Sequence, residues 1–292
     1  ARNKFMTTEI SIVLGSYNRR RFIEPTIESI RNNGIAVPYE TIVIDGGSTD
    51  GTLDWLVAQK DLITIVQHNR GTFRGKPIER RSWGYFMNLG FKAAQGKYIL
   101  MISDDCLLTP GSVMNGYHHF EAARASGRNV GAVAFYWRNW PEQQEYWVGR
   151  TLGRKMLVNH GMYLRSALAE IGWIEEEYYT FYHADGDLCL KLWAQGYEVI
   201  DCSTAFVEHF VHTNYRLRKG NNQAQQQDWQ RYKERWTGLF FDPQQPDEGD
   251  WLYTTYSDPH NTVAAFPKLA VMRYRFWQRL RRLHARFLNA PG

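Results

Sequence analysis

The sequence of 292 residues lacks two features that mark membrane-spanning and secreted proteins. It has no apolar run of about 18 residues, the length at which a stretch becomes a candidate membrane-spanning helix. Its N-terminus has no apolar core of the signal-peptide kind. We therefore expect a polypeptide that does not cross a membrane.

Cysteine is scarce as well, with 3 in the chain. Cys106, Cys189 and Cys202 show no metal-type spacing, and an odd number cannot all pair within one chain. This usage argues against a disulfide scaffold and favours a reducing compartment. We predict a cytoplasmic protein that is either free or peripheral on the inner face of the cell membrane. An internal repeat is also absent from the sequence.

The composition is otherwise that of a globular protein with a sizeable core. Hydrophobic residues make up 43% and charged residues 22% of the chain. The formal net charge of +5 favours anionic partners such as nucleotides or phospholipid surfaces. No motif that reads nucleic acid accompanies this charge, so nucleic acid is not an expected partner.

Short β-branched runs alternate with glycine-rich turns and helical patterns along the N-terminal part of the chain. Strand, turn and helix in repeated order imply right-handed crossovers and a mostly parallel sheet. Continuously apolar strands fit a sheet with helices on both faces, so we predict an α/β fold of Rossmann-like type. The expected strands are 10–14, 41–45, 62–66, 98–102, 130–136 and 198–209, and the expected helices lie near 22–30, 53–57, 82–94, 166–171 and 185–195. The segment 141–154 is expected to be a loop or hairpin.

Two carboxylates, Asp104 and Asp105, follow the predicted strand at 98–102. The carboxyl ends of parallel strands are where open α/β sheets bind ligands. Mg²⁺ and Mn²⁺ prefer oxygen ligands, usually one or two carboxylates together with substrate phosphates. The alternative is that the aspartates cap the next helix. The two interpretations stay open on these residues alone.

Seven segments in order, over roughly residues 9–210, resemble the family 2 glycosyltransferases, which are inverting enzymes with the GT-A fold. The C-terminal segment of about eighty residues is not covered by this resemblance. The matching segments are ISIVLGSYNR at 10–19, TIVIDGGSTDGT at 41–52, MNLGFKAAQGKYILMISDD at 87–105, LTPGSV at 108–113, NHGMYLRSALAEIGWIEE at 159–176, DGDLCLKLWAQGYEV at 185–199 and AFVEHF at 205–210.

The resemblance implies a divalent cation, Mn²⁺ or Mg²⁺, at a D-x-D-type motif that reads Ser103-Asp104-Asp105 here. The serine departs from the family pattern, so Asp105 is the expected principal ligand. Asp104 is expected to contact the ribose or the waters of the metal. A histidine after the later strand completes the site in the family, which implies His209, with His212 as the alternative.

The resemblance also implies a carboxylate base that takes the proton of the acceptor hydroxyl. Counting back six residues from Lys191 gives Asp185. Ala184 stands where the family usually has glutamate. Asp187, two residues beyond the expected base, is instead expected to cap the helix N-terminus.

The nucleotide pocket is expected at the ends of the first two strands. Gly46 stands where some relatives have a second acidic residue that reads the base, so UDP, GDP and dTDP all remain open as donor nucleotides. One of the basic residues Arg74, Lys76, Arg80 and Arg81 is expected to face the diphosphate. The predicted nucleotide-binding residues are Ser16, Tyr17, Asn18, Asp45, Arg81, Asn88 and Asp104. Asn159, His160 and Gly161 fall where the family lines the sugar pocket.

We expect a catalytic domain over residues 1–212 and a C-terminal extension over 213–292. Residues 267–289 predict an amphipathic helix with an arginine-rich polar face. Such a helix suits an anionic membrane surface, and it equally suits packing on the catalytic domain or on a second subunit of a homo-oligomer.

The expected reaction moves a sugar from a nucleoside-diphosphate sugar to a hydroxyl acceptor, a glycan or lipid-linked glycan of the cell envelope. Two alternatives remain. One is an inactive nucleotide- or carbohydrate-binding module, which Ser103, Gly46 and Ala184 favour. The other is a nucleotidyltransferase, which normally shows a glycine-rich basic loop after its first strand.

Overall fold

The computed structural model describes residues 7–140, 142–210, 215–245 and 253–256, together with 272 and 276. The strands are β1 (Ile10–Ser16), β2 (Tyr39–Asp45), β3 (Leu62–Val66), β4 (Thr72–Phe73), β5 (Lys76–Pro77), β6 (Tyr98–Met101), β7 (Cys106–Leu108), β8 (Val130–Trp140), β9 (Tyr146–Thr151), β10 (Lys155–Met156), β11 (Gly161–Leu164), β12 (Glu198–Phe210) and β13 (Tyr253–Tyr256). The helices are α1 (Arg20–Arg31), α2 (Thr52–Ala58), α3 (Trp83–Ala93), α4 (Ser112–Ala125), η1 (Leu152–Arg154), α5 (Arg165–Glu170), α6 (Ala184–Ala194) and α7 (Tyr215–Trp236).

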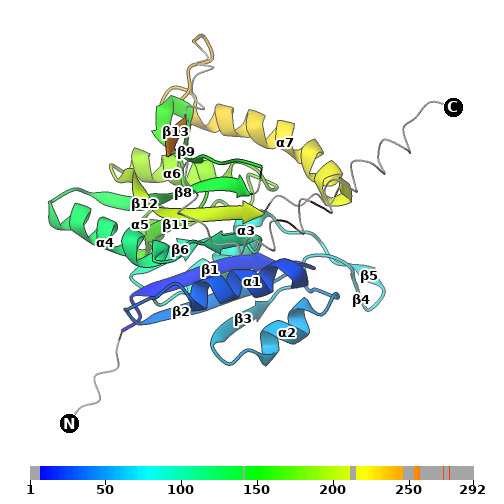
Figure 1. The fold of residues 1–292 in the computed structure, drawn as a ribbon. Helices are drawn as coiled ribbons and strands as arrows, with labels where there is room; N and C mark the ends of the chain where they lie inside the picture. Colours follow the sequence, from blue (N-terminus) through cyan, green and yellow to red (C-terminus); the bar gives the residue numbers. More distant parts are fainter. Residues whose placement is uncertain are drawn as a thin grey trace.

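One large sheet runs through the molecule in the order β10-β9-β8-β11-β6-β1-β2-β3 (Figure 1). Pairing is parallel among β6, β1, β2 and β3, and again between β8 and β12. The strands β9, β10, β11 and β13 pair with their neighbours in antiparallel fashion. The predicted α/β fold is confirmed, with parallel order in the N-terminal half and mixed order beyond it.

Topology decides which face each N-terminal helix covers. The chain steps outward from β1 to β2 to β3 and then returns to β6, beside β1. Right-handed connections therefore put α1 and α2 on one face and α3 on the other. On the α3 face, a Cβ at Gly90 would lie 2.5 Å from Ile44 and 2.6 Å from Val13, so the glycine permits the close approach of helix and sheet.

The core lies between these layers. Ile10, Ile12, Val13 and Leu14 of β1 are fully buried, as continuous apolar strands in a covered sheet should be. The parallel strands all end at one edge, and the loops that follow them meet there. That edge positions the candidate site.

Some predicted features lie outside the described residues. His212 and all but Met272 and Phe276 of the predicted helix at 267–289 are among them. Within the ranges that the structure describes, no helix has both the length and the apolar character needed to cross a bilayer.

Candidate active site

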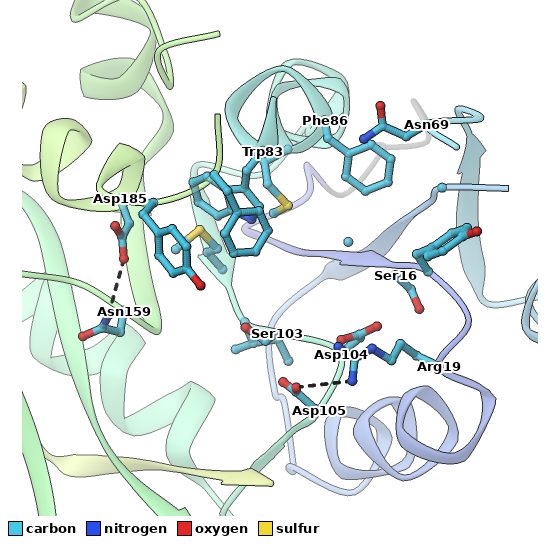
Figure 2. A pocket seen from close by; sticks show the side chains of 18 of the residues that line it. Ser16, Arg19, Asn69, Trp83, Phe86, Ser103, Asp104, Asp105, Asn159 and Asp185 are labelled. Carbon is cyan, nitrogen blue, oxygen red and sulfur yellow. Dashed lines mark hydrogen bonds and ion pairs between the residues drawn. The ribbon is translucent and has the colours of Figure 1, made fainter. Parts of the chain in front are cut away.

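A cavity of about 480 Å³ opens at the sheet edge where β1 and β6 end. Its walls come from distant segments of the chain, including the β1–α1 turn, the loop before α3, the turn after β6, the ends of β8 and β12, and the start of α6. Figure 2 shows Asp104, Asp105 and Arg19 near one another on one side, and Asp185 with Asn159 on another. The cavity is lined by many of the residues that the sequence predicted, namely Ser16, Tyr17, Arg80, Arg81, Asp104, Asp105, Asn159, His160, Asp185 and His209. Gly161, predicted beside Asn159 and His160, is not among the lining residues.

The pairing of β7 with the C-terminal end of β12 brings Asp105 and His209 together. β7 runs antiparallel to β12 with Cys106 opposite His209, and the Phe210 amide donates to the Asp105 carbonyl at 2.8 Å. As a result, His209 Nε2 lies 3.6 Å from Asp105 Oδ1. The other ring nitrogen, Nδ1, lies 2.9 Å from Asn139 Oδ1. An amide oxygen can only accept, so this contact favours the tautomer with the proton on Nδ1, in which Nε2 is the ring nitrogen that can bind a cation.

This donor set fits a divalent cation. An imidazole nitrogen whose tautomer is fixed by an outer partner, next to a carboxylate oxygen, is a common metal-ligand arrangement. The described residues contain no group of three or more ligating side chains, so a cation held here would take its other ligands from substrate phosphates and water. Such a site would be completed by the substrate.

Asp104 lies beside this pair and is 8% exposed. Burial, reinforced by the charge of Asp105, raises the pKa of Asp104 to about 7, although Arg19 opposes the shift. Arg19 Nη1 also lies 4.0 Å from Asp105 Oδ2. The two carboxylates therefore repel each other in a poorly solvated place, and a bound cation would relieve that repulsion.

Four arginines line the cavity: Arg19, Arg70, Arg80 and Arg81. Burial, with the nearby charge of Arg70, lowers the pKa of Arg80. Neighbouring guanidinium groups repel one another. A diphosphate would offset this repulsion, because its oxygens match the hydrogen-bonding geometry of guanidinium groups. Arg74 and Lys76, on the β4–β5 hairpin, are not among the lining residues.

Asn18 and Asp45 do not line the cavity, unlike Ser16 and Tyr17. The Asp45 carboxylate accepts from the Gly47 and Ser48 amides at 2.8 and 2.7 Å. Asn18, in the left-handed region with a φ of 53°, accepts from the Thr49 amide at 2.8 Å. Both side chains hold the loop after β2, and neither is among the lining residues. Gly46 of the same loop does line the cavity.

Asp185 stands in the first turn of α6. Its carboxylate accepts from the Gly186 amide at 2.8 Å and from Asn159 Nδ2 at 3.4 Å. Burial raises the pKa of Asp185, while these hydrogen bonds and His183 oppose the shift. A carboxylate with a raised pKa at a cavity wall is suited to accept a proton.

Asp187 and Asn88 make contacts within the protein. Asp187 is fully buried and accepts from Tyr179 Oη and Trp236 Nε1, each at 3.0 Å. Asn88 Nδ2 donates to the Ile174 carbonyl at 2.8 Å and to Glu176 Oε1 at 2.7 Å. Neither residue is among those that line the cavity.

The sequence did not single out several lining residues, among them Arg19, Trp137, Tyr182 and His183. Arg19 follows directly after the predicted Ser16–Asn18 segment, and that adjacency was the available signal. Trp137 reaches the cavity because β8 extends to Trp140. No local pattern marks His183, whose φ of 65° places it in the left-handed region just before α6.

Known proteins and one protein family are similar to this chain in sequence. A family model described as "Glycosyl transferase family 2" matches residues 11–170, more than half of the chain. Chondroitin synthase of Pasteurella multocida (strain Pm70) is 27% identical over 105 residues, 35% of this chain and 10% of that protein. TuaG of Bacillus subtilis (strain 168), provisionally assigned as a glycosyltransferase of teichuronic acid biosynthesis, is 29% identical over 103 residues, 33% of this chain and 35% of that protein. The chain thus matches only a minor part of either relative.

Solved structures show the same fold. The mannosyltransferase PcManGT from Pyrobaculum calidifontis, in complex with GDP-Man and Mn²⁺, superposes with a TM-score of 0.57 at 18% identity, over 81% of this chain and 66% of that one. S. aureus TarS 1-349 in complex with UDP-GlcNAc gives a TM-score of 0.53 at 15% identity, over 71% of this chain and 60% of that one.

Proposed function

The chain belongs to glycosyl transferase family 2, and from this we propose that it moves a sugar from a nucleoside-diphosphate sugar to a hydroxyl acceptor, with inversion. One observation carries the proposal. A single cavity has paired carboxylates, a histidine and four arginines in its walls, together with a carboxylate of raised pKa in the first turn of a helix. The paired carboxylates, the histidine and the arginines suit a diphosphate with its cation, and the carboxylate of raised pKa suits an acceptor hydroxyl.

In this proposal Asp105 and His209 hold Mn²⁺ or Mg²⁺, and Asp104 lies against the ribose or the waters of the cation. When bound, the cation supplies Lewis-acid stabilisation of the negative charge on the leaving diphosphate. The complex of PcManGT with GDP-Man and Mn²⁺ supports this assignment by analogy of fold. Arg19, Arg70, Arg80 and Arg81 add positive charge to the lining of the same cavity.

Asp185 is the proposed base. Its carboxylate takes the proton of the acceptor hydroxyl while the acceptor oxygen bonds to the anomeric carbon. The bond from that carbon to the phosphate oxygen breaks, and the nucleoside diphosphate leaves with the electron pair. Asn159 fixes the orientation of the carboxylate through its hydrogen bond.

We further propose that Ser16 and Tyr17 contact the nucleotide, while Asn18 and Asp45 shape the loop beside it. Asn88 acts at a distance, by holding the 174–176 segment against α3. The acceptor is proposed to be a glycan or lipid-linked glycan of the cell envelope, in line with the assignment of TuaG to teichuronic acid biosynthesis. The protein would then work in the cytoplasm, at or near the inner face of the membrane.

Release of nucleoside diphosphate tests the proposal. The wild-type chain is incubated with UDP-glucose, UDP-N-acetylglucosamine, GDP-mannose or dTDP-glucose, in Mn²⁺ or in EDTA. We expect release from one of these donors in Mn²⁺ and little in EDTA. A binding module with no catalytic activity would bind a donor and release nothing.

A further inference from the structure

The loop before α6 carries the cavity wall next to Asp185. Phe181, Tyr182 and His183 line the cavity, and Asp185 follows two residues after His183. The segment from Glu175 to His183 is irregular, so its backbone amides have no strand or helix partners of their own. Amides outside regular structure need an acceptor from a side chain or from water.

Asp228 of α7 supplies that acceptor. Its Oδ1 accepts from the Thr180 amide at 2.9 Å, and its Oδ2 accepts from the Phe181 and Tyr182 amides at 2.9 and 3.0 Å. Asp228 is fully buried and is not among the lining residues of the cavity. One carboxylate therefore fixes three successive amides, and charge-assisted bonds of this kind are among the stronger hydrogen bonds in proteins.

Other contacts of α7 tie it to the helix that carries Asp185. Trp236 Nε1 and Arg235 Nε lie 3.0 and 3.1 Å from Asp187 Oδ1. A Cβ at Gly186 would lie 2.8 Å from the hydroxyl of the buried Tyr232, so the glycine admits the close approach of α6 and α7. The ring of Tyr232 also stacks on His183, with centroids 5.2 Å apart and planes within 12°.

We infer that Asp228 is a positioning residue for the proposed base, and that α7 belongs to the catalytic unit. Asp228 holds the 180–182 loop, and the loop sets the place of His183 and hence the start of α6 with Asp185. The inference rests on the proposed function, because it assigns a purpose to the position of Asp185. It moves the boundary of the catalytic domain past residue 212 to the end of α7 at Trp236.

The kinetic test uses Asp228→Asn, Asp228→Ala and the matched control Glu234→Gln. Glu234 is an exposed carboxylate on the same helix whose side chain accepts from Gln230. The assay measures release of nucleoside diphosphate from whichever of UDP-glucose, UDP-N-acetylglucosamine, GDP-mannose and dTDP-glucose the wild type uses fastest. Folded sites are counted by nucleotide binding, so that kcat refers to folded protein.

We expect kcat to fall about tenfold in Asp228→Asn, which keeps one acceptor oxygen, and about a hundredfold in Asp228→Ala, since small displacements of a catalytic group cost factors of this size. KM for the donor should stay within about threefold, because the nucleotide wall is elsewhere, and Glu234→Gln should match the wild type. Equal kcat in wild type and Asp228→Ala would overturn the inference alone. No release by the wild type from any donor would overturn the proposed function and the inference with it.

Hydrogen exchange on the wild type provides a second measurement that needs no variant to fold. The Thr180, Phe181 and Tyr182 amides should exchange as slowly as the interior amides of α7, since both open together. Exchange of these amides at the rate of an exposed loop would contradict the inference.

Discussion

At the residue scale, the proposed proton transfer depends on Asp185. Asparagine at this position keeps the shape and the hydrogen-bond acceptor but cannot take a proton. We therefore expect Asp185→Asn to lower transfer by at least about a hundredfold, the size of a lost general base, while nucleotide affinity stays within about twofold. A radiochemical or coupled transfer assay, with nucleotide titration alongside, measures both.

The matched control for that variant is Asp201→Asn. Asp201 is a half-buried carboxylate that accepts from Tyr136 Oη at 2.7 Å and is not among the lining residues of the cavity. Its substitution should leave transfer close to wild type. Transfer by Asp185→Asn within a few-fold of wild type would refute the assignment of the base.

The pH dependence of kcat follows from the same residue. Burial raises the pKa of Asp185 above its usual value of 3.8, and the carboxylate must be deprotonated to act as base. Activity is thus full above the raised pKa and is lost as the pH falls through it, so the acid limb should lie above that of an ordinary aspartate. Tyr163 and Cys189 have raised pKa values and stay neutral on the acid side. His183, whose pKa is lowered by burial, and Asp104, whose pKa is raised to about 7, also bind protons there, so the acid limb reports these groups together with Asp185. A kcat profile that is flat down to pH 4 would contradict this expectation.

At the element scale, β8 and β12 are joined by a buried ion pair. Arg138 Nη2 lies 2.5 Å from Glu208 Oε1, and the two side chains are 3% and 0% exposed. Tyr146 Oη donates to the same oxygen at 3.0 Å. Breaking such a pair from one side leaves a charge buried without its counter-ion.

We expect Arg138→Met to destabilise the fold by about 3–5 kcal/mol, measured by urea unfolding. The double variant Arg138→Met, Glu208→Gln should recover part of that loss, because it removes the uncompensated charge as well. A single variant that unfolds at the wild-type urea midpoint would show that the pair does not hold the two strands.

Elements with strong local patterns could be predicted from the sequence. The apolar runs of β1, β2, β3 and β6 are continuous and bounded by glycine or aspartate turns. Their pattern and their length both indicated strands. The β4–β5 hairpin, β7 and β9 have no continuous apolar run of comparable length, so they could not be predicted from the sequence pattern. β7 is three residues long and forms through its pairing with β12, which comes about a hundred residues later in the chain.

The helix α7 was missed for a different reason. Its sequence is rich in glutamine, asparagine and charged residues, and this composition hid its buried face. Among the α7 side chains that the structure describes, from residue 224 onward, the buried ones are Asp228, Tyr232 and Trp236, which recur every four residues. A buried aspartate looks polar in a sequence, so the acceptor role of Asp228 became visible only once the loop it binds was in place.

The candidate site also divides into residues that the sequence predicted and residues that it did not. Asp104, Asp105, Asp185 and His209 belong to motifs, and the sequence placed them in one site by resemblance. Trp137 and His183 reach the cavity through the length of β8 and the turn before α6. Tertiary geometry of this kind leaves no local signal.

At the scale of the whole molecule, we expect two different roles for the part of the chain that follows residue 212. A chain that ends at residue 212 loses Asp228, Tyr232 and Trp236 and should fail to fold, whereas a chain that ends at 266 keeps them and should fold. We propose that residues 267–289 bind anionic membrane, since basic residues near such a surface contribute about 1 kcal/mol each.

Co-sedimentation with vesicles of phosphatidylglycerol and phosphatidylcholine tests this proposal. The full chain should bind more strongly than the chain that ends at 266, and vesicles of phosphatidylcholine alone should bind neither. If the shorter chain bound the anionic vesicles equally well, the membrane proposal would be wrong. In that case packing on protein would remain as the role of the segment.

The central claim, that the cavity is a metal-dependent nucleotide site, is tested most directly by thermal unfolding with UDP, GDP or dTDP, in Mn²⁺ or in EDTA. A ligand that binds only the folded state raises the unfolding temperature, by several degrees when it is present at about a hundred times its Kd. We predict that one of the three nucleotides raises the temperature in Mn²⁺ but not in EDTA, and that His209→Ala loses the effect whereas the exposed control His119→Ala retains it. Absence of any shift with all three nucleotides, or an equal shift in EDTA and in His209→Ala, would contradict the account.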